Sequence, residues 1–395
     1  MNNKRDNPTP GREPRVAIVH DYLNQHGGAE RVLEELHAIW PEAPIFVSIY
    51  DRERMPAAYR DWPIRPTFMQ RLPGILRNHQ PYLPVYPLAF ARLDLRGYDL
   101  VLSSSSAFAK NVHPAPGAVH ICYCHSPMRF AWNATDYARR ERLSPVARAA
   151  LWPLLRGVRA WDMRGTARVD YLIANSATVA ERIARFYRRE AIVIHPPVDT
   201  NVPLAGGTPD NYYLALTRLV PYKRLDIVIE AFNLLGKPLW IAGAGRDRAA
   251  LERLAGPTIR FLGRVSDEEK HRLYAHCQAT IFPAEDDFGI AQVEAQAAGR
   301  PVIAFRAGGA TESVREEVTG VFFDAQTPEA IVDAVRRFET LTFDPAAIRA
   351  HARTFDAAVF RKALKEFVDD RFRAHARSGA HPGQPAGRPQ AEAGT

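Results

Sequence analysis

The chain has 395 residues, of which 46% are hydrophobic and 24% charged, and its formal net charge is +8. This length exceeds what one small hydrophobic core supports, so two domains are expected. No apolar run reaches the roughly 18 residues that cross a bilayer, and the N-terminus has no apolar segment of a secretory signal. The three cysteines lack the spacing of a zinc site or a disulfide framework. We therefore expect a cytoplasmic protein, and since no nucleic-acid-binding signature occurs, its basic charge favours a membrane surface or an anionic substrate.

Short apolar runs alternate with helical patterns along the first half of the chain. Residues 1–13 are polar and are expected to be disordered. Strands are expected at 15–22, 99–105, 119–125, 170–176 and 191–197, and a helix at 27–40. Near-continuous apolar strands separated by helices indicate a parallel sheet that is covered on both faces. The sequence thus predicts a first doubly wound domain over residues 14–200.

The same pattern begins again after the segment 201–211, whose Pro and Gly content is typical of a linker. Strands are expected at 212–219, 238–245, 258–265, 279–284 and 300–305, and a helix at 225–235. A second α/β domain therefore spans 212–354, and a last helix, 355–375, crosses back to the first domain. Residues 376–395 are expected to be disordered. Ligands of such sheets bind beyond the carboxyl ends of the strands, which places the site in the cleft between two Rossmann-like domains.

Cations and small residues follow several of these strands. Arg218 and Lys223 lie on the loop after the first strand of the second domain, where they suit a diphosphate or are surface charges beside a helix. Gly27 and Gly28 form a turn where a phosphate or a sugar approaches closely. His125 ends a buried strand and is either a structural histidine or a cleft residue.

Three adjacent acids, Glu285, Asp286 and Asp287, lie between a strand and a helix in the stretch IFPAEDDFGIAQVEAQAAGRPVIA, residues 281–304. The helix begins near Gly289, where free N–H groups and a partial positive charge favour a phosphate. Glu294 lies about one turn into this helix. The acids hold sugar hydroxyls around that phosphate, or they cap the helix, or they bind manganese.

Together and in this order, the motifs resemble those of retaining nucleotide-sugar glycosyltransferases of family 4, which have the GT-B architecture of two Rossmann-like domains. The resemblance covers residues 15–370 and is strongest to a branch with many α-mannosyltransferases of bacterial polysaccharide assembly. It rests on the Gly-Gly turn and on SSSSAFAKNV, CYCHSPMRFAWN, HPPVDT, TRLVPYKRLD, FLGRVSDEE, EDDFGIAQVEAQAAGRPVIA and AGGATESVREEVTGVFF.

The resemblance implies a role for each matching residue. Arg218 and Lys223 match the pair that binds the donor diphosphate. His125 matches a histidine beside the reaction centre, and Asp286 matches the acid that contacts the transferred sugar. The implied donor-binding residues are Gly28 in the glycine turn, Gly263 and Val265 near the base, Phe288, Gly289 and Ile290 with their backbone N–H groups, and Glu294 on the ribose. One departure is Asp286 itself, because the family has a longer Glu there.

The implied reaction transfers a sugar, mannose from GDP-mannose, to a lipid-linked saccharide with retention and without a metal ion or other cofactor. Ser105 and Lys110 are acceptor candidates because they follow a strand end in the first domain. The Arg- and Trp-rich segment 139–168 suits either an anionic inner membrane or a solvated helix. Alternatives are another GT-B enzyme that uses a UDP-sugar, such as a synthase or an epimerase, and a non-catalytic protein that binds nucleotide sugars.

Overall fold

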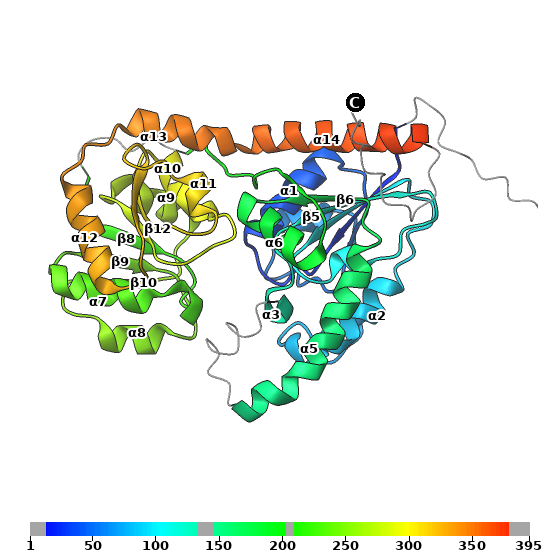
Figure 1. The fold of residues 1–395 in the computed structure, drawn as a ribbon, viewed down its shortest axis with the longest axis horizontal. Helices are drawn as coiled ribbons and strands as arrows, with labels where there is room; N and C mark the ends of the chain where they lie inside the picture. Colours follow the sequence, from blue (N-terminus) through cyan, green and yellow to red (C-terminus); the bar gives the residue numbers. More distant parts are fainter. Residues whose placement is uncertain (1–12, 133–144, 203–208, 379–395) are drawn as a thin grey trace, which may run out of the picture.

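The computed structural model describes residues 13–132, 145–202 and 209–378. Two lobes, each built around a twisted sheet, are joined along one side by a long helix (Figure 1). Residues 1–12 of the expected N-terminal tail, most of the expected C-terminal tail and residues 203–208 of the expected linker lie outside the described residues.

The first sheet has seven strands in the order β3-β2-β1-β4-β5-β6-β7, and all its pairs are parallel. Its strands are β1 Val16–His20, β2 Ile45–Val47, β3 Ile64–Pro66, β4 Leu100–Ser105, β5 Val119–Cys124, β6 Tyr171–Ala174 and β7 Ile192–Val193. Strands β1, β4 and β5 are buried along their whole length, which explains their near-continuous apolar runs.

The second sheet has six strands in the order β10-β9-β8-β11-β12-β13, again with parallel pairs. Its strands are β8 Tyr213–Leu216, β9 Leu239–Ala242, β10 Ile259–Gly263, β11 Thr280–Phe282, β12 Val302–Phe305 and β13 Gly320–Phe323. In both sheets the order reverses beside the first strand, which is the position where doubly wound sheets bind ligands.

Helices cover the faces of both sheets (Figure 1). The helices of the first lobe are α1 Gly28–Ile39, α2 Tyr86–Ala91, α3 Arg129–Trp132, α5 Pro145–Thr166 and α6 Ala177–Tyr187. Those of the second lobe are α7 Leu225–Leu235, α8 Arg248–Leu254, α9 Asp267–His276, α10 Ile290–Ala297, α11 Ala310–Ser313, α12 Pro328–Glu339 and α13 Pro345–Ala352. Short 3-10 turns are η1 Ala57–Asp61, η2 Phe68–Arg71, η3 Gln80–Val85, η4 Ala109–Asn111, η5 Pro221–Lys223 and η6 Arg353–Phe355.

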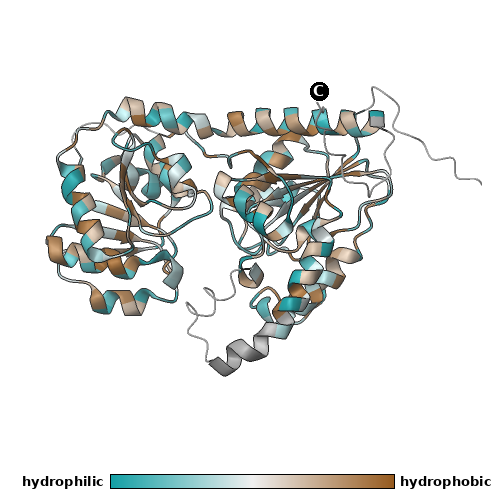
Figure 2. Cartoon of the chain, viewed as in Figure 1, coloured by the Kyte–Doolittle hydropathy of each residue, from teal (hydrophilic) through white to brown (hydrophobic). Residues whose placement is uncertain are grey.

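Local sequence signals set several helix starts. The Ser176 side chain accepts a hydrogen bond from the Val179 N–H at the start of α6, and Ser266 does the same for Glu269 at the start of α9. Pro328 opens α12 directly after the capping Thr327. Hydrophobic residues gather on the strands and on the helix faces toward them (Figure 2).

The last helix, α14 Ala357–Ser378, runs from the second lobe across the first (Figure 1). Phe360, Leu364 and Val368 are buried in the core between this helix, α1 and the first sheet. Arg361 also pairs with Glu35 of α1. The expected fold class is confirmed, since the chain forms two parallel-sheet Rossmann-like domains with helices around them.

Candidate active site

The middle one of the three adjacent acids pairs with a different cation from its two neighbours. Both carboxylate oxygens of Asp286 lie 2.6 Å from Lys223 Nζ, and both side chains are about one-sixth exposed. Lys223 ends the turn η5 after β8, whereas Asp286 follows β11, the neighbouring strand. The second domain therefore forms this pair alone, and it places a cation and a sugar-binding candidate at one edge of the sheet.

Glu285 and Asp287 instead face the first domain. Arg182 of α6 donates to Glu285 at 2.7 Å and also to Asp287. Arg129 of α3 pairs with Asp287, which raises the pKa of this guanidinium. The two outer acids thus bind arginines across the domain boundary and leave Asp286 for the site.

Glycines shape the loop that carries the acids. Gly289 has φ +88° and precedes α10, a conformation that L side chains rarely adopt. A Cβ on Gly309 would lie 2.1 Å from Phe288 Cα, and one on Gly308 would lie 2.2 Å from the Asp286 carbonyl oxygen. The Gly309 N–H also donates to that carbonyl at 2.9 Å. The Gly-Gly pair therefore fixes the acidic loop and the start of α10, where Ile290 follows.

Glu294 lies on α10, about one turn after its start, and its carboxylate points toward the first domain. Arg31 of α1 lies 2.7 Å from its carboxylate, and Lys270 lies 3.3 Å away. At the same boundary, a Cβ on Gly28 would lie 2.7 Å from Ile290 Cδ1. The turn formed by Gly27 and Gly28 thus lets α1 approach the start of α10 closely.

Arg218 lies on the loop between β8 and η5, and its guanidinium donates to the Tyr222 hydroxyl at 2.5 Å. Within the described ranges, no carboxylate lies at ion-pair distance from it. The backbone before Arg218 packs closely against Gly243, because a Cβ on Gly243 would lie 1.9 Å from the Thr217 carbonyl oxygen. The Gly243 N–H donates to Gly263 at the end of β10, and Val265 beyond it packs against the second core.

His125 directly follows β5 and is 9% exposed. Its Nε2 lies 2.8 Å from Ser104 Oγ on β4. Burial, together with the neighbouring His20, lowers the pKa of His125 to about 3. The imidazole is therefore neutral at physiological pH.

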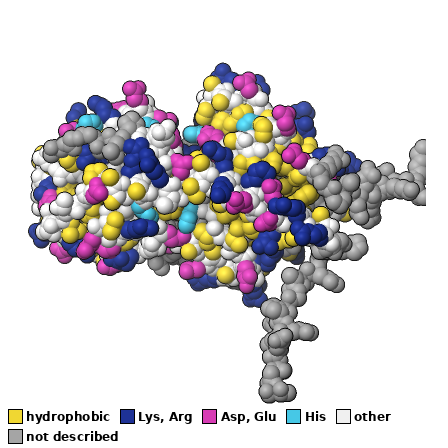
Figure 3. Space-filling model, turned by 90° about the horizontal axis from the view of Figure 1, so that it is seen from above, with side chains coloured by type: hydrophobic (Ala, Val, Ile, Leu, Met, Phe, Trp, Pro, Cys, Tyr) yellow, Lys and Arg dark blue, Asp and Glu magenta, His cyan; other side chains and the backbone are white. Residues whose placement is uncertain are grey.

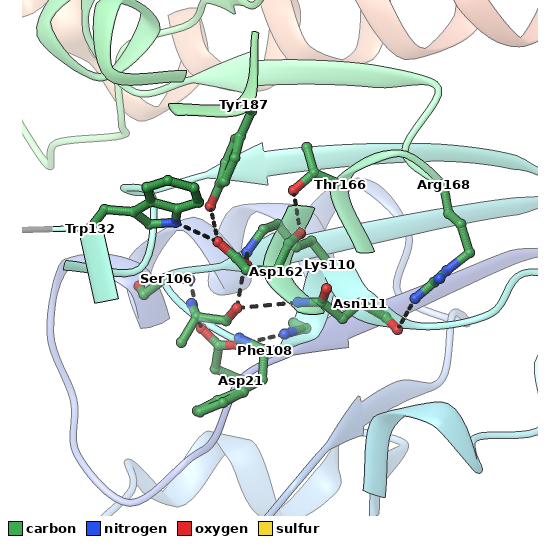
Figure 4. A network of polar contacts seen from close by, with 12 residues as sticks. Asp21, Ser106, Phe108, Lys110, Asn111, Trp132, Asp162, Thr166, Arg168 and Tyr187 are labelled. Atoms are coloured by element: carbon green, nitrogen blue, oxygen red, sulfur yellow. Dashed lines mark hydrogen bonds and ion pairs between the residues drawn. The ribbon is translucent and has the colours of Figure 1, made fainter. Parts of the chain in front are cut away.

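The two acceptor candidates are not presented to a ligand. Ser105 and Lys110 are each only 1% exposed. Lys110 Nζ donates to the Ala107 carbonyl at 3.0 Å and to Asp162 of α5 at 2.5 Å (Figure 4). This expectation was wrong for Lys110 because its position after a strand end did not reveal the acid on a distant helix.

The Lys110–Asp162 pair belongs to a buried network that anchors α5 (Figure 4). Trp132 Nε1 and the Tyr187 hydroxyl each donate to Asp162 at 2.8 Å. Nearby, the carboxylate of Asp21 accepts the backbone N–H groups of Ser106, Ala107, Phe108 and Ala109 at 2.6 to 3.0 Å. These contacts fix the loop that follows β4, and β4 is the neighbour of the strand that ends before His125.

The sequence assigned no role to four inter-domain residues, Arg31, Arg129, Arg182 and Glu312, although Arg129 and Glu312 lie within motifs of the resemblance. Glu312 of α11 accepts the Ala177 N–H at the start of α6 at 2.8 Å and pairs with His195 at 3.0 Å. Although burial opposes it, these hydrogen bonds hold the pKa of Glu312 below its usual range. The negative charge of Glu312 is stabilised by the partial positive charge at the start of α6.

Two further structural results bear on the sequence expectations. Among the described residues, no group of three His, Cys, Asp or Glu side chains is arranged to hold a metal ion. In the same part of the chain, every helix is too short or too polar to cross a membrane. The N-terminal part of the candidate membrane segment, 139–144, lies outside the described residues, as do the side chains at the start of α5.

Two family models match the chain along most of its length. Residues 26–202 match the model for Glycosyltransferase Family 4, and residues 204–355 match the model for Glycosyl transferases group 1. The boundary between the two matches coincides with the boundary between the two sheets. The chain carries both domains of a GT-B glycosyltransferase. The expected family-4 kinship is confirmed at this level.

Curated relatives of the glycosyltransferase are similar over different shares of their length. A D-inositol 3-phosphate glycosyltransferase of Geodermatophilus obscurus is 25% identical over 343 residues, which is 73% of this chain and 74% of the relative. Another of that name from a Nocardioides species is 28% identical over 211 residues, 42% of this chain and 45% of the relative. The matched stretch is thus less than half of the Nocardioides protein.

Solved structures show the same fold at low sequence identity. HepE from Anabaena in complex with UDP and glucose has a TM-score of 0.67 and 18% identity, with 90% of this chain and 100% of that chain covered. Sucrose-phosphate synthase from Thermosynechococcus elongatus has a TM-score of 0.69 and 16% identity, with 91% and 100% covered. Both likenesses support the GT-B architecture of the glycosyltransferase.

Proposed function

We propose that this glycosyltransferase moves a sugar from a nucleoside diphosphate to an acceptor, with Arg218 and Lys223 on the donor diphosphate. The observation that carries the proposal is the placement of Lys223 and Asp286 beside the N-terminus of α10, with Glu294 one turn further on. A diphosphate fits between the cations and the helix N–H groups. Asp286 and Glu294 then flank it as acceptors for the hydroxyls of the sugar and the ribose.

Transfer proceeds with retention in this proposal. Departure of the diphosphate builds negative charge on the leaving oxygen, which Arg218, Lys223 and the start of α10 stabilise. Neutral His125 accepts or donates a hydrogen bond at the sugar, and the leaving phosphate takes the proton of the acceptor hydroxyl. The arginine and lysine supply the positive charge at the leaving group, so full activity in excess EDTA is expected. Loss of activity that manganese restores would favour the metal-dependent alternative.

Mannose from GDP-mannose is the donor we propose, because the motifs resemble the mannosyltransferase branch. A UDP-sugar is the second candidate, since HepE was solved with UDP and glucose. The base of the donor is proposed to bind near Gly263 and Val265, where backbone groups would read it.

Donor binding should raise the melting temperature of the protein, because a ligand that binds only the native state stabilises it by mass action. A thermal-shift series with GDP-mannose, UDP-glucose, GDP and UDP measures this. We expect a shift of several degrees with GDP-mannose and GDP. A shift with the UDP pair alone would assign the donor to the second candidate, and no shift with any of the four would contradict a nucleotide-sugar site.

The proposed acceptor is a lipid-linked saccharide at an anionic membrane surface, and the Arg-rich character of α5 supports contact with that surface. The helix projects away from the first lobe (Figure 1). Two of its cations, Arg156 and Arg164, are exposed, whereas Arg159 donates to the Ala131 carbonyl at 2.6 Å and lies over Trp132. Basic and acidic side chains are otherwise intermixed on the face seen in Figure 3.

Reversing the charge of Arg156 and Arg164 to Glu should weaken sedimentation with anionic vesicles by about 30-fold or more, since each cation near the surface contributes about 1 kcal/mol. Arg373→Glu combined with Arg377→Glu, which reverses two exposed charges on α14, is the matched control. Equal binding of both variants and the wild type would remove α5 from the proposal. Inositol 3-phosphate, which the curated relatives name, is a further acceptor to assay.

A further inference from the structure

A row of buried polar side chains connects His125 to α1. His125 Nε2 lies 2.8 Å from Ser104 Oγ, and the same oxygen lies 3.0 Å from His20 Nδ1. His20 Nε2 lies 3.6 Å from Glu30 Oε1. Ser104 is fully buried, and His20 and Glu30 are each 3% exposed.

The parallel register of three neighbouring strands creates this row. His20 ends β1 and is paired with Ser104 of β4, and Ser105 is paired with Cys124, the last residue of β5. His125 follows directly, and its N–H donates to the Ser105 carbonyl at 2.9 Å. Glu30 reaches the row from the first turn of α1. Four elements thus deliver one side chain each to the carboxyl edge of the sheet.

The acid at one end gives the row a direction. A carboxylate beside His20 Nε2 favours the proton on that nitrogen and Nδ1 as the acceptor. The Ser104 hydroxyl then donates to His20 Nδ1, so its oxygen accepts a hydrogen bond. His125 supplies that bond from Nε2–H. Since the pKa of His125 is about 3, its ring carries one proton, and Nδ1 is left bare.

We propose that Ser104, His20 and Glu30 are positioning residues that hold His125 in the tautomer with its proton on Nε2. The bare Nδ1 is then the hydrogen-bond acceptor that His125 offers to a hydroxyl of the transferred sugar. The role at the sugar rests on the proposed function, whereas the tautomer is a property of the protein without substrate.

A second serine–histidine pair on the same strands provides the matched control. Ser103 Oγ lies 2.8 Å from His120 Nε2, and both residues are at most 1% exposed. Because strand residues alternate between faces, this pair lies on the opposite face of the sheet from Ser104. Ser103→Ala therefore removes an equivalent buried hydrogen bond without touching His125.

The tautomer is measured on the full chain with ¹⁵N-labelled histidine. Long-range ¹H–¹⁵N spectra distinguish a protonated from a bare ring nitrogen, and His125→Gln identifies the signals of His125 by their loss. We expect protonated Nε2 in the wild type and in Ser103→Ala, and a mixture of tautomers in Ser104→Ala and Glu30→Gln. A proton on His125 Nδ1 in the wild type, or an unchanged His125 tautomer in both Ser104→Ala and Glu30→Gln, would overturn the proposal.

Kinetics separate positioning from a structural role. Ser104→Ala should lower kcat roughly tenfold, as small misplacements of catalytic groups do, with little change in the KM for donor, and Ser104→Thr should restore it. In a His125→Ala background, Ser104→Ala should have no further effect, because coupled residues are non-additive. An equal loss of kcat in both backgrounds would contradict the proposal that Ser104 acts through His125. Absence of transfer by the wild type would instead contradict the proposed function and leave the tautomer result standing.

Discussion

Lys223→Ala is expected to reduce kcat by about 100- to 1,000-fold, the usual loss when one group that stabilises developing negative charge is removed. Lys223 lies beside Asp286 and the start of α10, where the leaving diphosphate is proposed to bind. Removal of Lys223 also leaves the Asp286 carboxylate without its cation. This negative charge then repels the donor phosphates. Steady-state transfer assays with the donor identified by thermal shift measure the effect.

The matched control for this substitution is Lys237→Ala. Lys237 pairs with Glu339 at 2.7 Å in the same domain, away from the candidate site. Both variants lose a lysine–carboxylate pair, so a comparable change in melting temperature with a loss of transfer confined to Lys223→Ala assigns the loss to chemistry. Transfer by Lys223→Ala within a few-fold of the wild type would remove this residue from the mechanism.

Asp162→Ala is expected to lower the free energy of unfolding of the first domain by about 3–5 kcal/mol, the cost of breaking a buried ion pair from one side. The change leaves the ammonium of Lys110 without a counter-charge at a site that is 1% exposed. Trp132 and Tyr187 lose their acceptor as well. Urea unfolding followed by tryptophan fluorescence measures this free energy. The signal reports mainly on the first domain, because Trp240 is the only tryptophan in the second domain.

Two controls bracket this prediction. Lys110→Met combined with Asp162→Asn removes both charges and keeps a carbonyl acceptor for Trp132 and Tyr187, so it should recover at least half of the loss. Asp369→Ala breaks an exposed pair with Lys365 on α14, for which about 0.5 kcal/mol or less is expected. If Asp162→Ala costs no more than Asp369→Ala, the buried network does not anchor α5.

The fold could be predicted from the sequence because its strands are buried on both faces. β1 and β5 therefore appear as largely apolar runs, β4 begins with one, and the Gly and Pro residues between domains are typical of a linker. The two strands on one side of the first sheet were less visible. β2 and β3 have only three residues each, and β3 is largely exposed, so neither was expected.

The part of the candidate site that lies on one loop could also be anticipated. The resemblance to family 4 singled out Asp286 from its two acidic neighbours, and in the structure Asp286 pairs with Lys223 whereas both neighbours pair with Arg182. What spacing could not reveal is which arginine approaches from the other domain. Arg129 and Arg182 are far from the acids in sequence, and their positions depend on how the domains meet. Lys110 was misread for the same reason, because its partner Asp162 lies on a distant helix.

A crystal structure with the donor that raises the melting temperature tests the central claim most directly. We expect its diphosphate at Arg218, at the start of α10 and at Lys223, whose pair with Asp286 opens to admit it. Asp286 should contact the sugar and Glu294 the ribose. A donor bound elsewhere, or one whose phosphates lie away from both cations, would contradict the account.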